Sequence, residues 1–337
     1  MTAYNKMISA ENKSGGGETT GNLLWLSSLR GIAALLVFIS HLPIHMDRIC
    51  FIVGRIGVCI FFLMSGYLAY GSRMKRTTRQ YLFNRFIRMY PVYWILLIFI
   101  FMLEGKYSGI ELAANFTLFQ EFLGVDCFIG ASWMMPIQIV FFLIVAFCAN
   151  NLFERKEFIF GISFDTISFG LFCISSIGIS YLRYHTNIPF PTAFVLLILV
   201  GYIGIDFRYN DSTYALKHLT LFEITLVISV CLSYSDMAGD YFFAYNLAIV
   251  IFFLFMKYGW NFYYMTLLSK IGFSFFLGSD IAYDFVLMLP GSSGYSLIMV
   301  CLLKFLFSIC IAWAMTTFIE KPLNQWEKRA ELYTIFG

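Results

Sequence analysis

The stretch Arg30–His41, RGIAALLVFISH, places an arginine and a histidine at the two ends of ten mostly apolar residues. The surrounding run, Leu24–His45, is long enough to cross a bilayer as one helix. In a helix these two residues lie about three turns apart, on nearly the same side, with roughly 16 Å between their Cα atoms. Titratable groups in such a segment are costly and usually functional. The alternative is that Arg30 marks the membrane boundary and His41 is a hydrogen-bonded interior histidine.

The whole chain has the composition of a membrane protein. Of its 337 residues 60% are hydrophobic and 13% are charged, whereas soluble domains carry about 25% charged residues. Apolar runs separated by polar segments predict an all-α integral membrane protein with about ten transmembrane helices. The predicted spans are Leu24–His45, Ile49–Tyr70, Tyr90–Leu103, Ser132–Ala149, Phe158–Tyr181, Phe190–Ile205, Leu219–Tyr234, Tyr241–Met256, Tyr263–Leu289 and Tyr295–Ile319.

The transmembrane domain is predicted to cover residues 24–322 and to leave two short tails. Residues 1–23 are polar, contain Ser14-Gly15-Gly16-Gly17 and lack the apolar core of a signal peptide. We therefore expect a flexible cytoplasmic tail there, and a second cytoplasmic tail at residues 323–337.

Lysine and arginine are distributed unevenly between the loops. The segment after the second span is predicted to be a basic loop, with Arg73, Lys75, Arg76, Arg79, Arg85 and Arg88. The loops on the opposite side hold only Arg48, Lys106 and Arg183. The positive-inside rule then places both termini and this basic loop in the cytoplasm.

Some predicted spans contain charges that hydrocarbon does not tolerate. Such residues should face the protein interior or an aqueous cavity; they are Arg55, Glu223, Asp280, Asp284 and Lys304. Asp280 and Asp284 share a helix face, and a structural ion pair with Lys304 is favoured over a catalytic role. His41 and His45 have a spacing that can bind a metal, but no third ligand is evident nearby, so no metal site is predicted.

Six segments carry further information when they are read in order. They are Arg30 with His41, GVCIFFLMSGYL at Gly57–Leu68, NRFIRMYPVYW at Asn84–Trp94, SWMMPIQIVFF at Ser132–Phe142, LSKIGFSFFLGSD at Leu268–Asp280 and FIEKPLNQWEKR at Phe318–Arg329. Together they resemble the acyltransferase-3 family of multispanning membrane acyltransferases, over about Leu24 to Arg329.

Three positions depart from the pattern of that family. Cys59 stands where an acidic residue is usual, Gln138 replaces a glutamate, and Ser279 replaces a late histidine. A proton relay through those positions is therefore in doubt. The arginines and the histidine are intact, as is a predicted turn at Ser65-Gly66-Tyr67, so an active enzyme is still expected.

The resemblance implies transfer of an acyl group, most often acetyl, from acyl-CoA to a hydroxyl of a cell-envelope polysaccharide or lipid-linked sugar, at the inner membrane. Its partners are then the donor, the glycan acceptor and membrane lipid, with no metal and no nucleic acid. His41 is the expected catalytic residue, together with Arg30, either as general base or as acyl carrier. Arginine-rich mouths bind CoA phosphates, which points to Arg30, Arg73, Lys75, Arg76, Arg85 and Arg88. The expected supporting residues are Ser65, Gly66, Tyr67, Trp133 and Glu320.

The glycines of the second span have a predicted packing role. Gly57, Gly66 and Gly71 are expected to let this span lie close to the first. Two other functions stay open at this stage. A transporter or flippase for a sugar or lipid would use the buried charges to line its path. A catalytically inactive membrane scaffold is suggested by Gln138 and Ser279.

Overall fold

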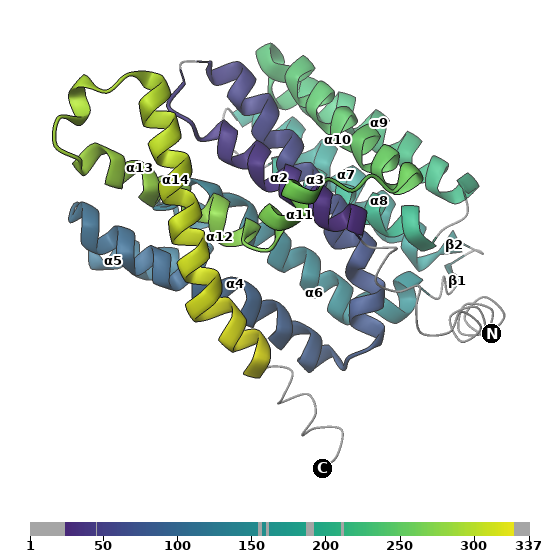
Figure 1. Ribbon diagram of the computed structural model, residues 1–337. Helices are drawn as coiled ribbons and strands as arrows, with labels where there is room; N and C mark the ends of the chain where they lie inside the picture. Colours follow the sequence, from purple (N-terminus) through teal and green to yellow (C-terminus); the bar gives the residue numbers. More distant parts are fainter. Residues whose placement is uncertain are drawn as a thin grey trace.

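The computed structural model describes residues 24–44, 46–153, 157–159, 162–186, 192–209 and 212–326 (Figure 1). The predicted N-terminal tail, His45 and residues 327–337 lie outside these ranges. Within them the protein is a bundle of helices, with one short antiparallel pair of strands, β1 (Glu157–Ile159) and β2 (Ile162–Ser163). Eight of the described helices are long and apolar enough to cross a membrane, in agreement with the predicted all-α membrane class.

The helices follow the order of the predicted spans. They are α2 (Leu24–Ser40), α3 (Asp47–Met74), α4 (Thr78–Glu104), α5 (Gly109–Phe116), α6 (Met134–Phe153), α7 (Phe164–Thr186), α8 (Thr192–Tyr209), α9 (Ser212–Ser233), α10 (Ala238–Tyr258), α11 (Tyr263–Ser269), α12 (Gly272–Leu277), α13 (Ser279–Met288) and α14 (Leu297–Met315). Short 3₁₀ turns occupy Gln120–Leu123, Gly130–Trp133, Ser235–Met237 and Ser292–Gly294. A π-helical turn at Thr316–Glu320 continues α14, and helical structure extends to Trp326.

The first helix is shorter than predicted. α2 ends at Ser40, because Pro43 lacks an N–H donor and disfavours a helical conformation in the residue before it. The backbone N–H of His41 donates to the carbonyl of Phe38 at 3.1 Å, in the turn that follows. His41 therefore lies beyond the helix, and the prediction that it shares one continuous helix with Arg30 is wrong.

The third helix is longer than predicted. α4 begins at Thr78, where Thr77 and Gln80 form a reciprocal capping box. Arg85 and Arg88 therefore lie on a helix and have fixed positions. The prediction of a basic loop is wrong except for the short connection that carries Lys75 and Arg76.

The predicted span Tyr263–Leu289 is three short helices, α11 to α13, instead of one. Gly272 and Gly278 stand at the two breaks, and glycine carries the largest helix penalty after proline. A Cβ atom on Gly278 would lie 2.9 Å from the side chain of Ile311, so the second break also lets this segment pack closely against α14.

α3 lies at the centre of the bundle and packs against α2, α6, α8 and α10 (Figure 1). A Cβ on Gly57 would lie 2.8 Å from the carbonyl of Ala33 in α2, as the predicted close approach requires. A Cβ on Gly66 would instead meet the carbonyl of Gly201 in α8, at 1.8 Å, so its predicted partner is wrong. A Cβ on Gly71 would lie 3.8 Å from the Tyr209 hydroxyl, an ordinary contact distance, so no close approach requires glycine there.

The predicted turn at Ser65-Gly66-Tyr67 is also wrong, because these residues lie within α3.

α3 runs between two ends of the bundle that carry different residues. We refer to the end that carries Arg73, Lys75 and Arg76 as the basic end. The end where α2 finishes and α3 begins is the His41 end.

Candidate functional site

A cavity of about 470 Å³ lies toward the basic end. Its lining includes Arg30 from α2, Arg85 and Arg88 from α4, and Lys270 from the turn after α11. Three of the six basic residues predicted to bind donor phosphates are thus brought to one cavity. Because four cations repel one another, this cavity is a favourable place for an anionic ligand.

The arginines of this cavity are held in different ways. The Arg85 guanidinium lies 4.5 Å from the ring centre of Phe142 and 5.1 Å from that of Tyr81. Its Nε is buried without a hydrogen-bond partner. Arg88, one turn later in α4, is exposed, as is Arg30. The stacking fixes one guanidinium in the wall, and the other two side chains remain accessible.

The remaining predicted donor-binding residues lie outside the lining of this cavity. Arg73 donates from Nε to the carbonyl of Ala146 at 3.0 Å, from Nη1 to that of Arg76 at 2.7 Å, and from Nη2 to Thr78 Oγ1 at 2.6 Å. It therefore ties α3 to α4 and α6. Lys75 and Arg76 lie in the connection beside it.

The wall of the basic cavity also holds several polar side chains. Gln138 Nε2 donates to Ser65 Oγ at 2.9 Å, so the residue that replaces the expected glutamate bridges α6 and α3. Glu320, from the π-helical turn, accepts a hydrogen bond from Ser274 Oγ in α12. π-helical turns are frequent at functional sites, and this one holds a carboxylate at the cavity.

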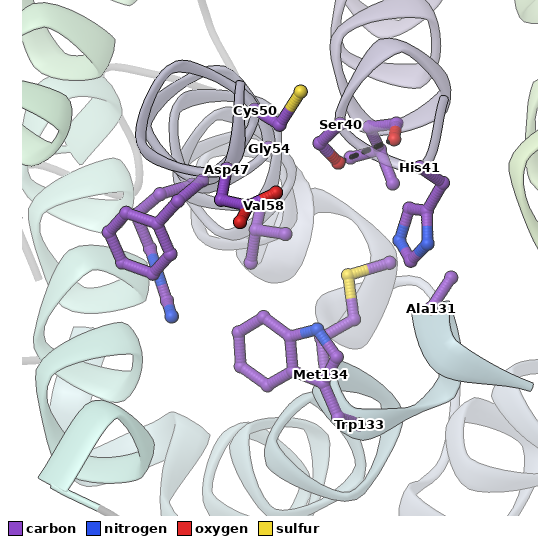
Figure 2. Close-up of a pocket in the computed structure, with 12 residues that line it drawn as sticks. Ser40, His41, Asp47, Cys50, Gly54, Val58, Ala131, Trp133 and Met134 are labelled. Carbon is purple, nitrogen blue, oxygen red and sulfur yellow. Dashed lines mark hydrogen bonds between the residues drawn. The ribbon is translucent and has the colours of Figure 1, made fainter. Parts of the chain in front are cut away.

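A second cavity, of about 310 Å³, lies at the His41 end. His41 and Trp133 line it together with Asp47, Cys50 and Arg55 of α3 (Figure 2). The lining combines aromatic, cationic and hydroxyl or carboxylate groups, as small-molecule sites often do. The structure thus separates the predicted catalytic histidine from the predicted arginines, and gives each its own cavity.

His41 faces Asp280, a carboxylate that was predicted to pair with Lys304. Its Nδ1 lies 3.6 Å from Oδ1 of Asp280, and the two side chains are each 25% exposed. Asp280 Oδ2 also accepts a hydrogen bond from the backbone N–H of Gly130 at 2.8 Å. Lys304 Nζ donates to the backbone carbonyl of His41 at 2.5 Å. The predicted ion pair of Asp280 and Asp284 with Lys304 is therefore replaced by a histidine–aspartate pair.

Met134 is the residue that the two cavities share. It is the first residue of α6, its side chain is 3% exposed, and it lines both the basic cavity and the His41 cavity. Figure 2 shows its side chain near His41 and Trp133. Its thioether side chain therefore lines both sites, a role that no local sequence pattern indicated.

The other predicted supporting residues have packing roles. Gly66 lies against α8, as described above. The Tyr67 ring lies 5.4 Å from that of Trp25 and 4.8 Å from the guanidinium of Arg208. Cys59 and Ser279, the two other departures from the family pattern, are fully buried, and the Ser279 hydroxyl donates to the carbonyl of Phe276 at 2.8 Å.

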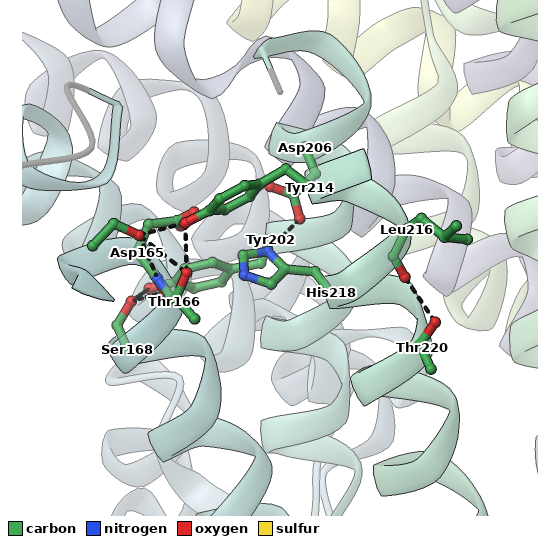
Figure 3. A network of polar contacts seen from close by, with 10 residues as sticks. Asp165, Thr166, Ser168, Tyr202, Asp206, Tyr214, Leu216, His218 and Thr220 are labelled. Carbon is green, nitrogen blue, oxygen red and sulfur yellow. Dashed lines mark hydrogen bonds and ion pairs between the residues drawn. The ribbon is translucent and has the colours of Figure 1, made fainter. Parts of the chain in front are cut away.

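A separate polar cluster joins α7, α8 and α9 (Figure 3). Asp165, Asp206 and His218 are all buried, with potential ligand atoms within 4.8 Å of one another. His218 Nδ1 lies 2.8 Å from Asp206 Oδ2, and Phe169 stacks on the imidazole at 4.3 Å. This cluster was not predictable from the sequence, because its members lie on three helices without a local motif. It lies apart from both cavities and cross-links one side of the bundle.

Comparison with known proteins adds the family. A family model described as an acyltransferase domain matches residues 23–330, which is nearly the whole chain. The chain belongs to the acyltransferase-3 family. No curated protein and no solved structure gave a significant match. Membership of this acyltransferase family confirms the predicted resemblance and shows a membrane acyltransferase in general terms.

Proposed function

We propose that this acyltransferase transfers an acyl group, most often acetyl, from acyl-CoA to a hydroxyl of a cell-envelope polysaccharide or lipid-linked sugar. The observation that carries the proposal is the pair of cavities that share Met134. One cavity has the charge expected for a CoA site, and the other holds a histidine beside a carboxylate. Donor and acceptor can therefore approach from opposite ends of the bundle.

The basic end is assigned to the cytoplasm of a cell with an inner membrane. The support for this orientation is the excess of lysine and arginine in the segments at that end. Acyl-CoA is cytoplasmic, so the basic cavity is then on the donor side. An envelope acceptor is on the other side, which is that of His41.

The phosphates of the donor are assigned to Arg30, Arg85 and Arg88. Guanidinium groups bind phosphate oxygens through paired, charge-assisted hydrogen bonds. Arg73, Lys75 and Arg76 would contribute long-range attraction at the same end, since Arg73 uses its donors to hold α3, α4 and α6 together. The thioester arm would extend past Gln138 and Ser65 toward Met134.

His41 is assigned the role of general base. Asp280 beside Nδ1 favours the tautomer with its proton on Nδ1 and leaves the lone pair of Nε2 for the acceptor. Nε2 takes the hydroxyl proton as the acceptor oxygen attacks the thioester carbonyl. The bond from carbonyl carbon to sulfur then breaks, and CoA leaves as a thiolate that receives the proton. Asp280 stabilises the imidazolium formed in between.

The proposal is tested by measuring CoA release from acetyl-CoA with the purified protein and a glycan acceptor. His41→Ala should lower the rate a hundredfold to ten-thousandfold, as removal of a general base typically does. A transporter or an inactive scaffold would release no CoA in either form. Release that is equal in wild type and His41→Ala would contradict the assignment of the base. Mass spectrometry of the surface glycan then identifies the acceptor.

A further inference from the structure

Arg55 is a cation in the wall of the His41 cavity, and none of the described residues supplies it with an anionic partner. It lies in the third turn of α3, and its Nη1 is buried without a hydrogen bond. Within the described part of the chain no carboxylate forms an ion pair with it. A charged group within a membrane protein is normally paired or used in function, because leaving it unpaired is costly.

Three aromatic rings surround the Arg55 guanidinium. Its carbon lies 5.2 Å from the ring centre of Phe51, 4.7 Å from that of Trp133 and 5.1 Å from that of Tyr241. Such contacts stabilise the cation and fix its plane. They do not satisfy its N–H donors, which prefer carboxylate or phosphate oxygens. The guanidinium is therefore held in place with hydrogen-bonding capacity left over.

Three carboxylates at this end of the bundle, those of Asp47, Asp240 and Asp280, form no ion pair with Arg55. Asp240 accepts from Arg48 Nε at 2.5 Å, and Asp280 faces His41 and Gly130. Asp47 lines the same cavity but precedes Arg55 by eight residues of α3, about 12 Å along the helix axis. Figure 2 shows the Asp47 carboxylate beside the cavity.

Cys59 occupies the position one helical turn deeper than Arg55, where an internal partner for the guanidinium could stand. It follows Arg55 by four residues, so the two side chains share a face of α3, and it is fully buried. An acid at this position, which the family pattern leads us to expect, would be close enough to pair with Arg55. The thiol of this chain leaves the guanidinium open to a ligand.

We propose that Arg55 binds an oxyanion of the acceptor, a carboxylate or a phosphate, so that the protein selects an anionic sugar. This inference rests on the proposed function, because it assigns the acceptor to the His41 cavity. The cavity volume of about 310 Å³ is at the lower end of the range for small-molecule sites, which suits a single sugar residue. Trp133 lies beside Arg55 and offers an aromatic surface to the sugar ring.

Binding of simple sugars tests the inference without any acyl donor. The thermal stability of the purified full-length protein in detergent is followed during titration with glucuronate, glucose 1-phosphate or glucose, at constant ionic strength. We expect stabilisation by an anionic sugar and none by glucose. The two anionic probes distinguish a carboxylate from a phosphate. An equal response to all three sugars would overturn the inference.

Substitutions at Arg55 assign the effect to its charge. Arg55→Gln should weaken the apparent affinity for the anionic sugar roughly tenfold to a hundredfold, the effect of losing one charge-assisted contact. Arg55→Lys should retain part of it. Arg48→Gln is the matched control on the same helix, since Arg48 is 68% exposed and already paired, and it should leave the affinity unchanged. Unchanged affinity in Arg55→Gln would overturn the proposal.

A second pair of variants changes the neighbour of Arg55 in place of Arg55 itself. Cys59→Asp supplies a carboxylate one turn from Arg55 and should remove the preference for anionic sugars. Cys59→Asn has nearly the same shape without the charge and should keep that preference. If both variants bind the anionic sugar equally well, the open charge of Arg55 is not the determinant.

The two proposals fail in distinguishable ways. Sugar binding that depends on Arg55, without CoA release from acetyl-CoA, would reject acyl transfer and keep the anion site. CoA release that depends on His41 and is equal for acidic and neutral acceptors in wild type and Arg55→Gln would reject the anion site alone.

Discussion

Asp280→Asn tests the histidine–aspartate pair most directly. The substitution keeps the side-chain volume, and the amide oxygen can still accept from Gly130. Two unit charges at 3.6 Å attract by about 4.6 kcal/mol at an effective dielectric constant of about 20. Both side chains are a quarter exposed, so solvent screening reduces this value, and we expect about 2–3 kcal/mol. That energy corresponds to a rate of acyl transfer roughly 30- to 150-fold lower.

The assay is CoA release at saturating acetyl-CoA and acceptor, with the amount of folded protein measured by size-exclusion chromatography. Asp284→Asn is the matched control, because it removes a carboxylate one turn further along α13. It should change the rate less than threefold, an estimate for a carboxylate that does not face His41. A rate in Asp280→Asn within twofold of wild type would refute the reasoning, as would an equal loss in both variants.

Three further predictions concern the donor site, the residue that lines both cavities and the stability of the protein. Arg88→Ala should raise the apparent KM for acetyl-CoA roughly tenfold to a hundredfold. Arg73→Ala should instead lower the melting temperature and leave this KM unchanged. Kinetics and thermal melts of the two purified variants check both expectations. Met134→Trp should block acyl transfer, because a larger side chain at the residue that lines both cavities should keep the acyl group from moving from one to the other. Acetyl-CoA binding, measured by equilibrium dialysis, should be kept, and transfer at the normal rate would contradict this. His218→Ala should destabilise the protein by about 3–5 kcal/mol, because the buried Asp206 carboxylate loses its imidazole partner. The exposed Thr220→Ala is the control in the same melts and should have no effect.

The sequence predicted the helical membrane class and the order of the apolar segments, because bilayer thickness fixes their length. About ten spans were predicted, and eight of the described helices are long and apolar enough to cross a membrane. Helix ends were less predictable. The basic stretch before Tyr90 reads as a loop by hydropathy, but the capping box at Thr77 starts a helix there. The break of the predicted span at Gly278 depends on its fit against Ile311 of α14, which only the tertiary structure supplies.

The candidate site was predictable where single residues carry the signal. Arg30 and His41 stand out as costly groups within an apolar segment, and both line cavities. The partner of His41 was not predictable, because Asp280 lies 239 residues later and local spacing favoured a pair with Lys304. Arg55 was recognised as a buried charge, but its aromatic surroundings come from three separate elements.

The 3₁₀ turn Gly130–Trp133 and the first residue of α6 connect these observations. The Gly130 N–H donates to Asp280, Trp133 stacks on Arg55, and Met134 lines both cavities. A Cβ on Gly130 would lie 3.2 Å from both the Asp280 carboxylate and the His41 ring, so the backbone itself forms part of the site. One short segment therefore positions the Asp280 carboxylate, the Arg55 guanidinium and the residue that lines both cavities. Substitutions that displace this segment should therefore affect all three features at once.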